Sequence, residues 1–170
     1  MFRIVQTWAL LEREFPDWHL TIVGDGLERS ILEKLVADLD LKQVRFEGFQ
    51  HPKPYYERAS ILVLTSEYEG FPLVLAECMS FGVVPVVYGS YLAVYDIIEH
   101  GKNGIVVQPK GGKFDAEEMA GGLVRLMSDA GKRGSMVLAA MEKSRDYSIE
   151  TIARKWEDLF TNLSKQENKS

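Results

Sequence analysis

Two glutamates, Glu69 and Glu77, lie on either side of a Gly-Phe-Pro turn that opens an apolar segment. Pro72 has a fixed φ and no N–H group, so it suits the first position of a helix, with Phe71 as the expected N-cap. Free N–H groups at such a helix start attract a phosphate. Glu77 would lie about 7.5 Å beyond Pro72 along the helix axis. This distance is comparable to that between the distal phosphate and the ribose of a nucleotide. We therefore expect a sugar-nucleotide site here.

The same two glutamates fit a second interpretation. One carboxylate would be favoured by the positive end of the helix dipole, and the other would lie on a solvated helix face. The spacing alone leaves both interpretations open.

A chain of 170 residues with 46% hydrophobic and 26% charged residues is expected to form one soluble globular domain with a single core. We expect the domain to cover residues 1–163 and residues 164–170 to form a frayed polar tail. The formal charge of −5 argues against nucleic acid as a partner. Cys78 is the only cysteine, so no disulfide framework is predicted. No apolar run reaches the ~20 residues that a membrane-spanning helix needs.

Short apolar strands alternate with helical patterns along the chain. The strands are predicted at 19–23, 44–46, 61–64, 83–88 and 104–107, and the third is expected to be fully buried. The helices are predicted at 4–14, 28–39, 72–82, 115–127, 131–145 and 148–164, with a helical turn at 54–58. This alternation predicts a doubly wound, parallel, Rossmann-like α/β sheet.

Three segments follow strands of the predicted sheet and would meet at its carboxyl edge, where such sheets bind ligands. They are Gly24-Asp25-Gly26, Gly48-Phe49 and 66–71. A tight turn is a competing explanation for the first of them. The Asp115 to Glu118 spacing resembles a capping box and predicts the start of the helix at 115–127.

Four stretches resemble, in order, the C-terminal donor-binding half of retaining glycosyltransferases. They are TIVGDGLERSILEKLVADLDL, VRFEGF, ILVLTSEYEGFPLVLAECMSFGVVPVV and DIIEHGKNGIVV. The family is glycosyl transferases group 1, which has the two-domain GT-B fold. The resemblance covers nearly the whole chain, and its most specific part is the pair of glutamates with seven residues between them, the Gly-Phe-Pro included.

The resemblance implies a role for each matching residue. Glu77 would bind the ribose hydroxyls, and Glu69, the catalytic candidate, would contact the donor sugar without being a nucleophile. The N–H groups of Gly70 and Phe71 would contact the sugar together with Glu69. Those of Leu73 and Val74 would hold the distal phosphate, and a glycine loop would approach the diphosphate. The donor-binding set implied in this way is Gly24, Asp25, Gly26, Arg45, Phe46, Ser66, Glu69, Gly70, Phe71, Pro72, Leu73, Val74 and Glu77. No metal or other cofactor is implied.

The chain departs from the family pattern in two places. The family's first strand, with a Gly-Arg and a following Lys aimed at the diphosphate, would precede Met1, and Arg3 is not a convincing substitute. That strand would be central in the sheet, so we expect a gap between the strands at 19–23 and 61–64. In the segment 88–98, Ser90, Tyr91 and Asp96 replace a Gly-Gly-x-x-Glu loop.

The last predicted helix carries an apolar stripe, formed by Ile152, Trp156, Leu159, Phe160 and Leu163. Packing on its own domain is the default expectation. An exposed stripe would instead promote self-association.

Taken together, these features predict the donor-binding domain of an enzyme that transfers a sugar from a nucleotide-sugar, expected to be a UDP-sugar, to a polysaccharide or glycolipid acceptor. The acceptor would bind an N-terminal domain outside this sequence, and the 170 residues alone would be inactive. The expected location is the bacterial cytoplasm, at the inner face of the membrane, in lipopolysaccharide or capsule assembly. The alternative is a truncated, non-catalytic nucleotide-binding module or one half of a split enzyme.

Overall fold

The structure, a computed structural model, describes residues 1–167. Its strands are β1 (Leu20–Val23), β2 (Val44–Gly48), β3 (Ile61–Leu64), β4 (Val84–Tyr88) and β5 (Ile105–Val107). Its helices are α1 (Phe2–Ala9), α2 (Arg29–Asp38), α3 (Lys53–Tyr56), α4 (Leu73–Ser80), α5 (Ala93–Ile97), α6 (Ala116–Met127), α7 (Ala130–Ser144) and α8 (Ile149–Glu167), with a 3₁₀ turn at Arg145–Tyr147. The predicted alternation of strands and helices is confirmed.

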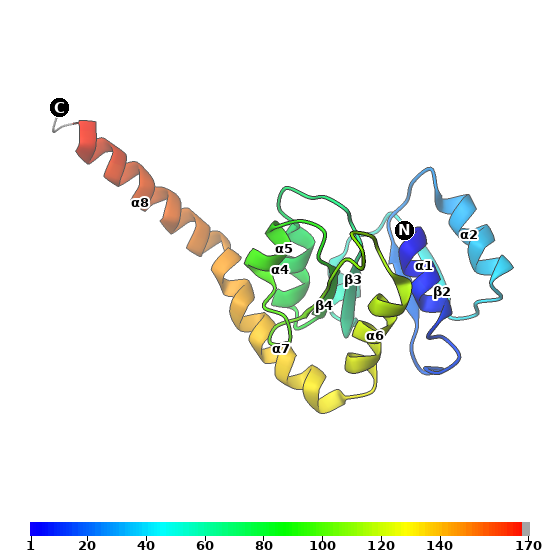
Figure 1. The fold of residues 1–170 in the computed structure, drawn as a ribbon. Helices are drawn as coiled ribbons and strands as arrows, with labels where there is room; N and C mark the ends of the chain where they lie inside the picture. Colours follow the sequence, from blue (N-terminus) through cyan, green and yellow to red (C-terminus); the bar gives the residue numbers. More distant parts are fainter. Residues whose placement is uncertain (168–170) are drawn as a thin grey trace.

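The strands form two separate parallel sheets (Figure 1). β1 pairs with β2, and β3, β4 and β5 pair in that order. Helices connect the paired strands, as parallel pairing requires. The predicted gap between β1 and β3 is therefore observed, and we call the two parts the β1–β2 half and the β3–β5 half.

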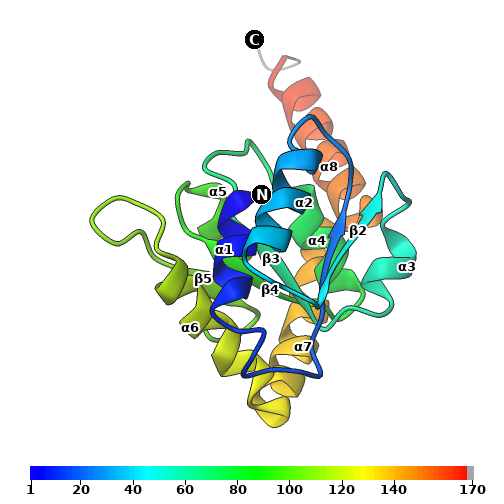
Figure 2. The same cartoon turned by 90° about the vertical axis from the view of Figure 1, so that its right-hand side faces the viewer.

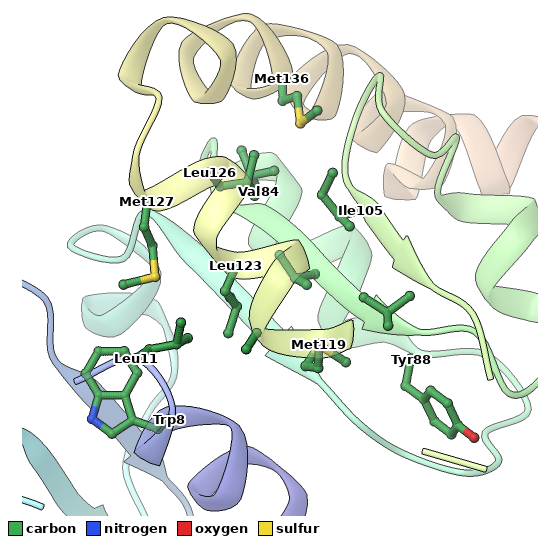
Figure 3. Packing of buried hydrophobic residues seen from close by; sticks show 13 residues of the cluster. Trp8, Leu11, Val84, Tyr88, Ile105, Met119, Leu123, Leu126, Met127 and Met136 are labelled. Atoms are coloured by element: carbon green, nitrogen blue, oxygen red, sulfur yellow. The ribbon is translucent and has the colours of Figure 1, made fainter. Parts of the chain in front are cut away.

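The β3–β5 half is built around β4, all of whose residues are buried. Because side chains alternate along a strand, β4 serves two cores. Val84, Val86 and Tyr88 face a cluster that includes α6 and the end of α1, whereas Val87 faces a cluster that includes α4 and α5. Figure 3 shows Trp8 and Leu11 from the α1 region beside Leu123 and Met127 of α6 in the first of these clusters.

The β1–β2 half has a smaller core, in which Val5, Ile22 and Leu32 are the buried apolar side chains. A buried carboxylate supplements it. One oxygen of Glu12, whose residue is 8% exposed, accepts hydrogen bonds from the N–H groups of Lys42 and Gln43, which lead into β2. This half therefore depends on a polar anchor as well as on apolar packing.

Arg3 connects α1 to the β3–β5 half. Its guanidinium donates to the Thr65 carbonyl (3.2 Å) and pairs with Glu67. The same group lies over the rings of Tyr88 (5.3 Å) and Phe114 (5.1 Å). One side chain thus holds the start of α1 against the loop that follows β3.

Two predicted elements differ from the observed ones. The helix predicted at 4–14 ends at Ala9 and continues as hydrogen-bonded turns up to Phe15, just before Pro16. The strand at Ile61–Leu64 was expected to be fully buried, but all four of its residues are only partly buried. The reason is that one edge of β3 faces the gap instead of a neighbouring strand.

The helix α8 projects away from the rest of the molecule (Figures 1 and 2). Its stripe residues are 37–60% exposed, so the expectation that the stripe packs on its own domain is wrong. The helix continues to Glu167 and includes residues 164–167 of the predicted tail, while residues 168–170 lie outside the described part. Within residues 1–167, no helix combines the length and apolar character that a membrane crossing demands.

Candidate functional site

A cleft of about 1040 Å³ opens between the two halves and reaches the carboxyl ends of the strands. Of the predicted donor-binding residues, Gly24, Arg45, Ser66 and Val74 line it. Gly24 and Ser66 follow β1 and β3, and Val74 lies in the first turn of α4. Arg45 is the second residue of β2, and Phe49, just after that strand, also lines the cleft. The structure therefore brings together the three segments that the sequence placed at the carboxyl edge of the sheet.

The start of α4 differs from the prediction by one residue. Pro72, not Phe71, is the N-cap, and its φ of −78° and ψ of 79° are those of the central residue of an inverse γ-turn. Accordingly the Leu73 N–H donates to the Phe71 carbonyl over 2.9 Å. The prediction that this N–H is free for a phosphate is wrong for this conformation. Among the described residues, no backbone acceptor is found for the N–H groups of Gly70, Phe71 and Val74.

Glu77 lies one turn into α4, and its carboxylate accepts a hydrogen bond from the Tyr56 hydroxyl (3.2 Å). Burial raises the pKa of Tyr56, and the charge of Glu77 raises it further, so the hydroxyl remains a donor. The Tyr56 ring also packs against Phe81, with the centroids 5.7 Å apart. Glu77 is thus held by a side chain that the sequence analysis did not select.

Glu69 lies close to Tyr91, a residue that is only 9% exposed. Desolvation raises the pKa of Tyr91 to about 12, with a smaller contribution from the Glu69 carboxylate. The Tyr91 hydroxyl is buried and has no hydrogen-bond partner among the described residues. Its ring lies 6.4 Å from that of Tyr68, so two aromatic side chains flank the loop that carries Glu69.

Hydrogen bonds within the chain, as well as a role in ligand binding, can explain the glycines in the loop after β1. The Gly24 N–H donates to the Gly48 carbonyl (2.7 Å), and Gly24 has a φ of 131°, which disfavours any residue with a side chain. The Asp25 carboxylate accepts from the N–H of Gly26 (2.9 Å). A Cβ atom built on either glycine would meet open space, so a ligand has access to this backbone.

The remaining predicted residues, Glu69 and Glu77 among them, do not line this cleft. Phe46 packs against the small core of the β1–β2 half. Phe71 is 44% exposed and lies 5.4 Å from the ring of Tyr147, and Leu73 is 64% exposed.

Four residues near the site were missed by the sequence analysis or given no role there. Tyr56 and Tyr91 contact or approach the two glutamates, and Arg3 reaches Thr65 at the end of β3. The Ser90 hydroxyl, in the segment that departs from the family pattern, donates to the Ser66 carbonyl (2.9 Å). Only the position of Ser90 and Tyr91 within that unusual segment gave a signal in the sequence.

Cys78 is a free, fully buried thiol in α4. Burial raises its pKa, and it donates to the Leu75 carbonyl (3.3 Å), as expected of a core residue. In the described part of the chain, no group of three or more histidine, cysteine, aspartate or glutamate side chains is placed to hold a metal ion.

Comparison with known families decides what kind of protein carries this cleft. The family model for glycosyl transferases group 1 matches residues 1–143. The chain belongs to this family. Membership confirms the resemblance found in the sequence, supports a transferase, and does not favour the non-catalytic alternative.

Among curated relatives, an exopolysaccharide phosphotransferase of Streptomyces coelicolor is 36% identical to this chain over 162 residues. This match covers 94% of the chain and 17% of the relative. An uncharacterized glycosyltransferase of Haemophilus influenzae is 34% identical, covering 92% of the chain and 44% of the relative. The chain thus spans less than half the length of these relatives.

Solved structures show the same fold. A pneumococcal O-GlcNAc transferase, solved with UDP and GlcNAc, superposes with a TM-score of 0.85 at 19% identity, over 95% of this chain and 32% of that one. The C-terminal domain of a Francisella tularensis glycosyl transferases group 1 protein superposes with a TM-score of 0.76 at 24% identity, over 86% and 78%. The chain therefore has the fold of the C-terminal half of a GT-B enzyme.

Proposed function

We propose that this chain is the donor-binding domain of a retaining glycosyltransferase that uses a UDP-sugar and acts on a polysaccharide or glycolipid acceptor. The observation that carries the proposal is the meeting of the Gly24 loop, Ser66 and the start of α4 on one cleft. Relatives support the chemistry. The pneumococcal structure contains UDP and GlcNAc, an Anabaena HepE structure contains UDP-glucose, and a Campylobacter jejuni relative transfers N-acetylgalactosamine to an undecaprenol-linked glycan.

In this proposal the diphosphate lies at the positive end of α4. The N–H groups of Gly70, Phe71 and Val74 are available there, and Leu73 adds a fourth when its γ-turn opens. These oriented dipoles stabilise the negative charge that develops on the leaving diphosphate. The acceptor oxygen then bonds to the anomeric carbon on the face from which the diphosphate departs. The hydroxyl proton passes to the departing diphosphate, and the configuration of the sugar is retained.

The two carboxylates bind opposite ends of the donor. Glu77, oriented by the Tyr56 hydroxyl, accepts hydrogen bonds from the ribose diol. Glu69 contacts the transferred sugar, beside the unpartnered hydroxyl of Tyr91. Hydrogen bonds to an ionised carboxylate are stronger than neutral ones, so Glu77 should contribute measurably to nucleotide affinity.

Isothermal titration of the chain with UDP tests the proposal. We expect Glu77→Ala to weaken UDP binding by about 1–3 kcal/mol, roughly 5- to 150-fold in Kd, because a charge-assisted hydrogen bond is lost. Glu142→Ala, which removes an exposed glutamate from α7, is the matched control and should leave the Kd unchanged. Equal affinities for UDP in the two variants would contradict the assignment of Glu77. Titration with GDP and ADP tests the choice of base.

The exposed apolar stripe of α8 is a candidate surface for binding a partner chain. Trp156 and Phe160 are 54% and 60% exposed, and their rings stack 5.6 Å apart. We expect the isolated chain to self-associate through this stripe, since apolar side chains gather there without cover from the described residues. Light scattering should give a mass that falls to that of the monomer in Trp156→Glu. A monomeric parent chain at all concentrations would argue against it.

A further inference from the structure

The two glutamates of the candidate site are held differently in the structure. The Glu77 carboxylate accepts a hydrogen bond from the Tyr56 hydroxyl (3.2 Å). Glu69 is partly buried, and no hydrogen bond or ion pair to its carboxylate is found among the described residues. One carboxylate therefore has a side chain that fixes its direction, and the other has none within residues 1–167.

The segment that follows β4 brings a second tyrosine beside Glu69. The Ser90 hydroxyl donates to the Ser66 carbonyl (2.9 Å), which ties this segment to the loop that carries Glu69. The Tyr91 ring lies 6.4 Å from the ring of Tyr68, the residue next to Glu69. Both contacts hold Tyr91 against the loop from which the Glu69 side chain extends.

The Tyr91 hydroxyl is a hydrogen-bond donor without an acceptor. The residue is 9% exposed and packs in the core cluster that includes Leu75 and Val94. Its oxygen is buried and has no hydrogen-bond partner in the described part of the chain. Such a group costs free energy, because it has lost its water and gained no other partner. Phenylalanine would fill the same space without this cost, so ring packing alone does not explain a tyrosine here.

The surroundings of this hydroxyl favour a carboxylate as its acceptor. Burial, with a smaller contribution from the Glu69 carboxylate, raises the pKa of Tyr91 to about 12. The hydroxyl therefore keeps its proton at neutral pH and can donate it in a hydrogen bond. An ionised carboxylate accepts stronger hydrogen bonds than a neutral group does. Donor and acceptor thus lie close together in this structure without being paired.

We propose that Tyr91 is a positioning residue for Glu69, in the way that Tyr56 is for Glu77. When a nucleotide-sugar binds, the Glu69 side chain turns toward Tyr91, and one carboxylate oxygen accepts a hydrogen bond from the tyrosine hydroxyl. The other oxygen is then directed at the hydroxyl groups of the transferred sugar. The unpaired hydroxyl of the free protein gains its partner in the complex. This inference rests on the proposed function, because Glu69 has this task only if the chain binds a nucleotide-sugar.

The test is isothermal titration of the full chain with UDP, UDP-glucose and UDP-GlcNAc. The readout is the ratio of the Kd for UDP to the Kd for each UDP-sugar, because this ratio isolates the contribution of the sugar. We expect Tyr91→Phe to lower the ratio about 3- to 10-fold for the sugar that the parent chain binds best, since one charge-assisted hydrogen bond is lost. The Kd for UDP itself should not change. Tyr56→Phe should weaken UDP and the UDP-sugars by the same factor and leave the ratio constant.

Tyr95→Phe is the matched control for general damage to the segment after β4. The Tyr95 hydroxyl donates to the Gly89 carbonyl (2.9 Å), so the variant disturbs the backbone two residues from Tyr91 while leaving the Tyr91 hydroxyl in place. We expect a lower urea midpoint for this variant and an unchanged ratio. A Glu69→Ala background separates positioning from direct contact. There Tyr91→Phe should have no further effect on the ratio, because the residue through which Tyr91 acts is gone.

The results can contradict the inference in three ways. Tyr91→Phe may keep the parent's ratio, or the ratio falls equally in Tyr91→Phe and Tyr95→Phe; either result would overturn the proposal. A further loss from Tyr91→Phe in the Glu69→Ala background would show that the hydroxyl contacts the sugar directly, which overturns the positioning role. A parent chain that binds neither UDP nor either UDP-sugar contradicts the proposed function as well, whereas the three results above contradict this inference alone.

Discussion

The two halves of the molecule differ in how completely their strands are buried. In the β3–β5 half, β4 lies between two neighbours, and helices cover both of its faces, so all its residues are buried. In the β1–β2 half, each strand has one neighbour, and Val5, Ile22 and Leu32 are the buried residues of its apolar core within residues 1–167. A parallel strand needs neighbours on both edges as well as helices on both faces to become an interior strand.

The comparison also shows where the candidate site gets its rigidity. The helix α4, which carries Glu77, packs in the larger core through Leu75 and Met79. The glycine loop extends from β1, in the half with the smaller core. We therefore expect the two walls of the cleft to differ in stability, and substitutions can measure that difference.

The largest effect is expected from truncation of the larger core. Leu75→Ala removes a side chain with no exposed surface and should lower the free energy of unfolding by about 2–5 kcal/mol, since it leaves a cavity. Leu32→Ala, in the smaller core, should be at the lower end of this range, about 2 kcal/mol, because fewer buried side chains surround it. Urea unfolding measures both, and a larger loss for Leu32→Ala would break the comparison.

Removal of the polar anchor comes next. Glu12→Ala leaves the N–H groups of Lys42 and Gln43 without their shared acceptor, and we expect a loss of about 1–3 kcal/mol. Glu12→Gln keeps an oxygen acceptor and should lose less. Urea unfolding, together with exchange at the Gln43 amide, follows the effect. If both variants match the parent chain, the β1–β2 half does not depend on this carboxylate.

A smaller effect is expected from the link between the halves. Arg3→Met keeps the apolar stem but loses the contacts with Thr65, Glu67 and the two rings. We expect it to lower the free energy of unfolding by about 1 kcal/mol. Arg3→Lys keeps the charge and loses the planar group, so it separates charge from stacking. Salt should weaken only the charge-dependent part. An unchanged urea midpoint in Arg3→Met would mean that α1 is held to the β3–β5 half by apolar contacts alone.

The smallest effect is a pH dependence in the helix that covers both the cleft and β4. The Asp115 carboxylate caps α6 by accepting from the N–H groups of Glu118 and Glu117, and the first of these is the main reason that its pKa lies below 3.8. A pKa that is lower in the folded state stabilises the fold above the unfolded value. The contribution is therefore present above pH 3.8 and lost as the pH falls through the folded pKa.

Urea midpoints of the parent chain and of Asp115→Asn, measured from pH 7 to pH 3, test this dependence. The gap between the two midpoints should shrink below pH 3.8, whereas Glu142→Gln should show no such change. A gap that is constant with pH would show that the charge of Asp115 does not contribute.

Much of the fold was predictable because its signals are local. The apolar run at 61–64 and the Asp115 cap gave strand and helix boundaries close to the observed ones. The Gly-Phe-Pro turn placed the start of α4 within one residue, because proline restricts only its own φ and its missing donor. The site segments met as predicted because the carboxyl ends of parallel strands share one edge.

The rest depended on contacts between distant residues, which no local pattern encodes. Tyr56 reaches Glu77 from α3, and Arg3 reaches Thr65 across the cleft. The burial of β3 was overestimated because an apolar run does not reveal whether the neighbouring strand is present. The γ-turn that occupies the Leu73 N–H is likewise set by the path of the whole loop.

The sequence by itself determined the parallel α/β class, the family and the residues that gather at the carboxyl edge, because periodicity, turn chemistry and motif spacing act over short stretches of chain. Only the tertiary structure decided that α8 leaves its apolar stripe uncovered, that Glu12 anchors the β1–β2 half, and that Tyr56 reaches Glu77. Those features depend on contacts between segments that are distant in the sequence. Such contacts form only in the assembled fold.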